Sequence, residues 1–176
     1  MIVCERIVNT DTYAGTCDII TGIKDFEAEA TFNSDWHTYR INGVIVPSVT
    51  QLLADGSYDH VDPVVLERAA KKGTLVHKEI QEWLEDGKNG YTDELYEFIR
   101  LYEENKELFN QKAIFDIKTT CRLDKVKTKK QCEMYAEGVK HLTGEGIDKL
   151  YAIWLPSKKK GKIEELKEIY YGKDNR

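Results

Sequence analysis

The segment AIFDIKTT, residues 113–120, is an apolar run that carries an acidic residue and a lysine two positions apart. Side chains alternate along a strand, so Asp116 and Lys118 point to one face while Phe115 and Ile117 point to the other. Buried charge without a partner is expensive. The pair is therefore either a functional group in a core strand, or a plain ion pair or an edge strand that faces solvent.

Helices are predicted on the N-terminal side of this strand, over most of residues 48–110. Cap residues of the Ser, Asp and Thr type precede apolar residues at helical spacing, and one of them forms a capping box with a glutamine three positions later. A glycine inside the second helical pattern is expected to break it in two. The expected helices follow Ser48, Asp62, Gly73 and Thr92, and a last one covers residues 128–142.

Strands are predicted at both ends of the chain, and Asn42-Gly43 is a strong signal for a tight hairpin turn. The class is α/β (α+β), a mixed sheet with helices packed against it. One domain covers residues 1–176, divided into N-terminal strands (1–33), a helical region (48–110) and a C-terminal part (113–171). The expected strands are residues 2–8, 13–21, 25–32, 39–41, 44–46, 113–119, 150–155 and 163–171.

Composition and charge limit the function classes. No stretch approaches the roughly 20 apolar residues of a membrane span, so we expect a soluble cytoplasmic protein without a membrane partner. The net charge of -5 and the pI of about 5.5 give no global basic field that would gather nucleic acid. Four cysteines lack any CxxC pair, and we expect them to be core residues: Cys4, Cys17, Cys121 and Cys132.

Basic residues nevertheless gather in two runs after the central strand. Each could contact phosphates, or be a solvated loop or hairpin tip. The first run contains Arg122, Lys125, Lys127, Lys129 and Lys130, and the second contains Lys158, Lys159, Lys160 and Lys162.

Two predicted helices offer further candidate site residues. His77 lies one turn into a helix and could present an imidazole nitrogen, although a lone helical histidine is usually a surface or hydrogen-bonded residue. Gln131 and Tyr135 are four positions apart on the helix after the D-x-K strand, so they share a face. From the residues alone, this pair is indistinguishable from ordinary helix surface and core.

Four segments in order resemble motifs of phage-type exonucleases in the RecB and CRISPR-adaptation branch of the PD-(D/E)XK nuclease superfamily. They are PSVTQLL, ERAAKKGTLVH, IFDIKTT and QCEMYA, within residues 36–156. The resemblance implies a restriction-endonuclease-like mixed sheet flanked by helices. It also implies a DNA exonuclease that acts in phage or mobile-element recombination or repair, in the cytoplasm of a bacterial or phage-infected cell.

One motif of that family, a G-T-x-D strand, is missing from its usual place before the D-x-K strand. YAGTCDII, residues 13–20, is similar to it and follows CERIVNT, which resembles the acid-bearing strand that pairs with it. We infer a permuted segment order in which Asp18 lies beside Asp116. If one chain cannot connect in this way, an exchange of the hairpin between two copies would predict a homodimer.

The resemblance also implies roles for the residues. Asp18, Asp116, His77 and the backbone carbonyl of Ile117 would hold Mg2+ or Mn2+, with Glu5 as an additional acid. Lys118 would orient or deprotonate the attacking water, with Gln131 and Tyr135 positioning it or the substrate. The first basic run would hold the DNA backbone. The cysteines do not reproduce the arrangement of the iron-sulfur members, so no cluster is expected.

Two other functions remain open from the sequence. A catalytically inactive copy of the nuclease fold could bind DNA or a protein partner. A structural interaction protein would fit the acidic balance of the chain and would have no affinity for DNA even at low salt.

Overall fold

The computed structural model describes residues 2–4, 30–33, 38–54, 56 and 59–167. Within them the chain is mixed α/β, with five helices and two sheets. The strands are β1 (Ile2–Cys4), β2 (Ala30–Asn33), β3 (Thr38–Ile41), β4 (Val44–Val46), β5 (Ala113–Lys118), β6 (Lys149–Trp154) and β7 (Lys162–Glu165). The helices are α1 (Val49–Leu52), α2 (Pro63–Asp86), α3 (Asp93–Glu104), α4 (Lys106–Phe109) and α5 (Lys125–Thr143).

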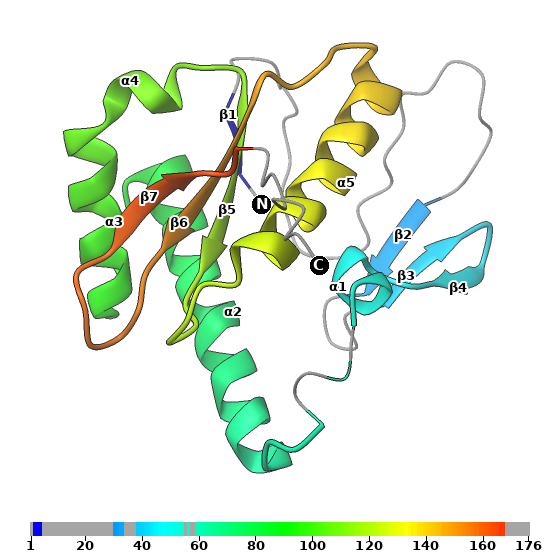
Figure 1. Cartoon of the computed structure of the whole chain (residues 1–176), viewed down its shortest axis with the longest axis horizontal. Helices are drawn as coiled ribbons and strands as arrows, with labels where there is room; N and C mark the ends of the chain where they lie inside the picture. The colour runs from blue at the N-terminus through cyan, green and yellow to red at the C-terminus, as the bar shows by residue number, and fades with distance from the viewer. Residues whose placement is uncertain (1, 5–29, 34–37, 55, 57–58, 168–176) are drawn as a thin grey trace, which may run out of the picture.

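The larger sheet has the strand order β1-β5-β6-β7 (Figure 1). Strands β5 and β6 are parallel and are connected through α5, whereas β1 and β7 pair antiparallel at the two edges. A parallel pair needs a crossover connection, and α5 supplies it. The carboxyl ends of β5 and β6 therefore meet at one end of the sheet.

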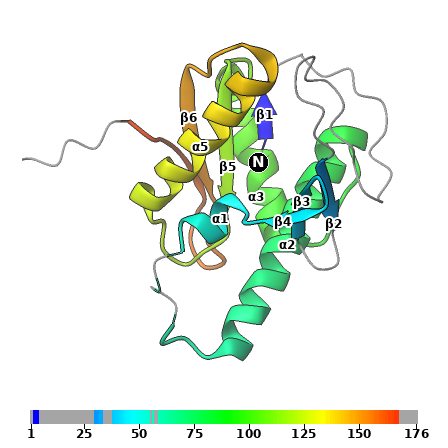
Figure 2. The same ribbon diagram turned by 90° about the vertical axis from the view of Figure 1, so that its right-hand side faces the viewer.

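Strand β5 separates two cores because its side chains alternate. Ala113, Phe115 and Ile117 join the core with α2, α3 and α4, and Ile114 joins Cys132 of α5 in the other. Figure 2 shows α5 on one side of β5 and β6, with α2 and α3 on the other. All five residues from Ala113 to Ile117 are buried, so the predicted D-x-K strand is a core strand and not one that faces solvent.

The predicted helix starts are confirmed by their caps. Ser48 and Gln51 make the reciprocal capping box, the Asp62 carboxylate accepts from Val64 N–H, and Thr92 Oγ1 accepts from Leu95 N–H. The predicted break at Gly73 is wrong, because α2 is one helix of 24 residues. One glycine in a helix costs only about 1 kcal/mol relative to alanine, which the packing of Val76 and Ile80 in the core offsets.

The smaller sheet contains β2, β3 and β4 in that order. Asn42 and Gly43 both have positive φ, 51° and 78°, as the predicted tight turn between β3 and β4 requires. The helix expected over 128–142 begins earlier, at Lys125 after the Asp124 cap. The strand expected over 163–171 ends at Glu165, and the expected hairpin strand 13–21 lies outside the described residues.

No helix of the described part of the chain is both long enough and apolar enough to span a membrane.

Glu79 joins α2 to α3 inside the protein. Its side chain is buried, and its carboxylate accepts hydrogen bonds from the backbone N–H groups of Tyr91 (2.9 Å) and Thr92 (3.1 Å) and from Thr92 Oγ1 (2.5 Å). A Cβ added to Gly90 would lie 2.5 Å from the Glu79 Cδ, so only glycine fits there. Burial raises the pKa of Glu79, but these hydrogen bonds outweigh it and hold the pKa below its ordinary value of 4.5.

Glu79→Ala is expected to lower the free energy of unfolding by about 2 to 3 kcal/mol at neutral pH, because buried donors lose a charged acceptor. Since the folded-state pKa is lowered, the contribution of Glu79 is complete above pH 4.5 and is lost as the pH falls through the lowered value. Urea denaturation at neutral pH and at about pH 3 measures both effects.

Glu82→Ala is the matched control on the same helix, since Glu82 is more exposed and lies 3.8 Å from Lys78. Equal losses for the two variants would contradict the assigned role of Glu79.

Candidate active site

Asp116 and Lys118 lie at the carboxyl end of β5 on the face toward α5. Asp116 is only 3% exposed, and its Oδ2 lies 2.8 Å from Lys118 Nζ. Among the described residues, this buried Oδ2 has no hydrogen-bond partner, so the contact with the ammonium is an ion pair without hydrogen-bond geometry. A buried carboxylate paired with one ammonium group is thus held inside the protein at the end of the sheet.

Lys118, Gln131 and Tyr135 form a hydrogen-bonded chain. Lys118 Nζ donates to Gln131 Oε1 (2.7 Å), and Gln131 Nε2 donates to Tyr135 OH (2.7 Å). An ammonium group can only donate, so the amide oxygen of Gln131 must face Lys118. Burial raises the pKa of Tyr135, and the phenol therefore keeps its proton. These two hydrogen bonds fix the direction of the Lys118 side chain. They are possible because Gln131 and Tyr135 share one face of α5, as predicted.

His77 reaches the same end of β5 from the opposite layer, on α2. Its Nε2 lies 3.1 Å from the carbonyl oxygen of Ile117. Burial lowers the pKa of His77, although the nearby charge of Asp116 acts in the other direction. The ring is therefore neutral at neutral pH. In this state Nε2 donates to the carbonyl and Nδ1 is left as an acceptor.

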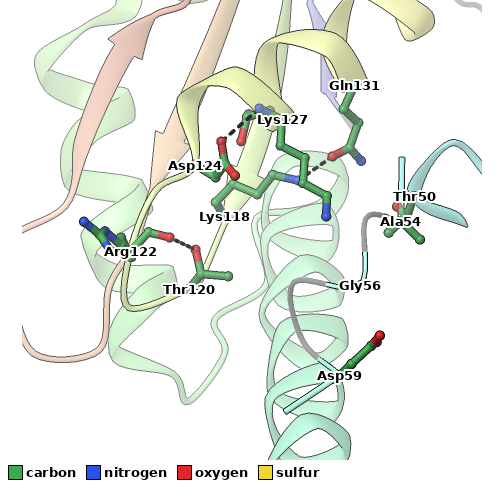
Figure 3. A pocket seen from close by; sticks show the side chains of 11 residues that line it. Thr50, Ala54, Gly56, Asp59, Lys118, Thr120, Arg122, Asp124, Lys127 and Gln131 are labelled. Carbon is green, nitrogen blue, oxygen red and sulfur yellow. Dashed lines mark hydrogen bonds between the residues drawn. The ribbon is translucent and has the colours of Figure 1, made fainter. Parts of the chain in front are cut away.

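A cleft of about 310 Å³ opens beside Lys118, between α1, the loop after β5 and the first turns of α5 (Figure 3). Hydroxyl groups, cationic side chains and two aspartates line it. Such a lining suits a ligand that carries oxygens and negative charge. The lining residues are Thr50, Ala54, Gly56, Asp59, Lys118, Thr120, Arg122, Asp124, Lys127, Thr128 and Gln131.

The residues of the first basic run have different surroundings in the structure. Its lysines belong to α5 and not to a loop or hairpin tip, because the helix begins at Lys125. Arg122 and Lys127 line the cleft. Lys125 is paired with Glu164 and Lys129 with Glu133, while Lys130 is exposed. Two of the five predicted phosphate contacts are thus already neutralised by carboxylates.

The remaining predicted site residues lie elsewhere. Asp18 and Glu5 lie outside the described residues, whereas β1, which precedes them, pairs with β5. In the part of the chain that the structure describes, no three His, Cys, Asp or Glu side chains form a metal-binding group. The described candidate ligands are His77, Asp116 and the Ile117 carbonyl.

Some residues of the cleft were missed by the sequence analysis. Thr128 is buried and precedes Gln131 and Tyr135 on one face of α5, at helical spacing that could have identified it. Thr50 and Thr120 give no such signal, because α1 and the loop after β5 meet only in the folded chain.

The described cysteines differ in their surroundings. Cys132 is fully buried and Cys121 is exposed, so the prediction of a core position is confirmed for the first and wrong for the second. Burial, with the charge of Asp116 as a second cause, raises the pKa of Cys132 to about 12. Cys17 lies outside the described residues, as does the Cys4 side chain.

No protein-family model, curated protein or solved structure matches the chain.

Alkylation of the folded protein at about pH 8 is expected to modify Cys121 and to leave Cys132 unmodified, because a buried thiol with a raised pKa carries almost no thiolate. Mass spectrometry of the separate peptides measures this, with the urea-unfolded protein as the control in which both react. Equal modification of the two cysteines in the folded protein would mean that the face of β5 carrying Asp116 is not covered by α5.

Proposed function

We propose that the protein is a metal-dependent DNA nuclease of the PD-(D/E)XK type, with a restriction-endonuclease-like fold in permuted order. The observation that carries the proposal is the buried Asp116 carboxylate at the end of β5, paired with Lys118, whose ammonium group is directed by Gln131. A buried carboxylate next to an oriented lysine suits a site that receives a cation and a phosphate.

The described residues fit a hard divalent cation. Asp116, His77 and the Ile117 carbonyl would hold Mg2+ or Mn2+, and Mn2+ tolerates the imidazole better. His77 Nε2 and the Ile117 oxygen lie 3.1 Å apart, so both could serve one cation, and binding through Nε2 would require the tautomer that carries its proton on Nδ1. When bound, such a cation neutralises charge on the phosphate oxygens and activates water.

Asp18, and Glu5 as an additional acid, complete the ligand set in this proposal. The support is the G-T-x-D resemblance of residues 13–20 together with the pairing of β1 beside β5. Permutation of this hairpin within one chain is the simpler form of the proposal. Its exchange between two copies is the other, and it requires a homodimer.

Lys118 is the catalytic residue for the attacking water. Its Nζ is directed by Gln131 and lies next to Asp116, so it can orient the water and stabilise negative charge that develops on the phosphate. Tyr135 is a positioning residue, because it acts on Lys118 only through Gln131. The adjacent cleft with Arg122 and Lys127 would hold the DNA backbone. The order of the motifs favours an exonuclease. It would act in the cytoplasm, in phage or mobile-element recombination or repair.

Wild-type protein is expected to shorten end-labelled linear DNA in Mg2+ or Mn2+ and to leave closed circular DNA intact. Asp116→Asn and Lys118→Ala are each expected to reduce the rate by about 100-fold or more, because each removes a group that acts on the reacting phosphate or water. Gel analysis of both DNA forms over time measures this.

Asp148→Asn and Lys140→Ala are the matched controls, since both residues are exposed and lie away from the cleft lining. Cleavage of circular DNA would mean that the protein is an endonuclease and not an exonuclease. DNA binding without any metal-dependent cleavage would instead favour an inactive nuclease-fold module.

Metal binding can be tested without activity. Saturating Mn2+ is expected to raise the Tm of the wild type by several degrees, because a ligand at about 100 times its Kd adds about 2.7 kcal/mol to stability. Asp116→Asn should lose most of this rise, and Asp148→Asn should keep it. A rise that is the same in all three proteins would place the cation elsewhere.

A further inference from the structure

The loop between β6 and β7 carries the second basic run. Its sequence is PSKKKG, residues 156–161, and Lys158, Lys159 and Lys160 are all exposed. Pro156 and Gly161, at the two ends of the loop, are buried. Both ends are therefore anchored in the protein while the three lysines between them face solvent.

Three contacts fix this loop against the helical layer. Gly161 N–H donates to Glu97 Oε1 (2.6 Å), and Arg100 donates to the Gly161 carbonyl (3.3 Å). Lys72 Nζ donates to Ser157 Oγ (2.7 Å). A Cβ at Gly161 would lie 2.8 Å from the Glu97 Cγ and 3.0 Å from the Trp154 carbonyl oxygen. The loop is thus held in one place on the protein.

The three lysines form no salt bridge with the described acidic residues around them. Among the described residues, no carboxylate forms a salt bridge with Lys158, Lys159 or Lys160. Asp93, Glu94 and Glu97 lie in the same depression as Lys159 and Lys160. Glu94 is paired with Lys72, and Glu97 with Arg100. In a chain with a net charge of -5, this loop is a local concentration of exposed positive charge.

The loop lies at the same end of the sheet as the candidate site. Lys118 is in register with Trp154, the last residue of β6, and Trp154 Nε1 donates to the Thr120 carbonyl (2.7 Å). Figure 1 shows the β6–β7 loop beside the loop that follows β5, with α1 on the far side of that second loop. The site therefore has the cleft with Arg122 and Lys127 on one side and the three lysines on the other.

We propose that Lys158, Lys159 and Lys160 bind the backbone of duplex DNA, as a phosphate-binding surface separate from the cleft. The proposal rests on the proposed nuclease function and deepens it by naming the substrate class. A single strand that occupies the cleft leaves this loop without a partner, whereas the second backbone of a duplex supplies one. Lysine is a hydrated point charge on a flexible stem, which suits contact with phosphates without reading the sequence.

The test is a triple variant, Lys158→Ala, Lys159→Ala and Lys160→Ala. Binding of a short labelled duplex and of its single strand is measured by fluorescence anisotropy in EDTA, so that cleavage does not intervene, at several salt concentrations. The duplex affinity is expected to fall about tenfold or more, and the salt slope of the binding constant to decrease by about 2 to 3. The single-strand affinity should change less than twofold.

A charge-matched control replaces Lys106, Lys140 and Lys149 with alanine, because these lysines lie away from the carboxyl ends of β5 and β6. Equal losses in the two triple variants, or equal losses for duplex and single strand, would overturn the proposal. These results would leave the nuclease function standing if the wild type still cleaves DNA. If the wild type binds no DNA even at low salt, the proposed function fails and this inference fails with it.

Discussion

The structure depends on one strand that has a core on each of its faces and ends in a charged pair. Residues 113–117 of β5 are buried. Because side chains alternate along the strand, Phe115 points to the core with α2, α3 and α4, and Asp116 points toward α5. Asp116 is paired with Lys118 of the same strand, and Gln131 of α5 accepts a hydrogen bond from Lys118. The polar part of the protein is therefore concentrated where β5 and β6 end.

Helix α2 connects the parts around this end. One of its faces places His77 at the Ile117 carbonyl, while Glu79 holds the start of α3. Nearer its N-terminus, Lys72 binds both Glu94 of α3 and Ser157 of the β6–β7 loop. A single unbroken helix thus sets the positions of the imidazole, of α3 and of the lysine loop. This is why continuity through Gly73 matters for the site and not only for the fold.

The sequence was informative where the physical cause is local. Cap residues such as Thr92 act within one helical turn, and Asn42-Gly43 sets its own backbone conformation. The helical spacing of Gln131 and Tyr135 likewise fixed their shared face. Prediction from the sequence failed where the cause is distant. Cys121 is exposed, Gly73 does not end a helix, and Glu79 is buried and connects α2 to the start of α3. Each of these depends on what packs against the residue, which short-range patterns do not encode.

By itself, the sequence determined the α/β class, most helix starts and the residues able to carry chemistry, because periodicity, capping and residue type act over a few neighbouring positions. Only the tertiary structure decided which of these residues meet. It placed His77 against the Ile117 carbonyl, left one oxygen of Asp116 without a hydrogen bond, and paired Lys125 and Lys129 with carboxylates while Arg122 and Lys127 line the cleft. These outcomes depend on distances between segments far apart in the chain, and packing of the whole domain sets those distances.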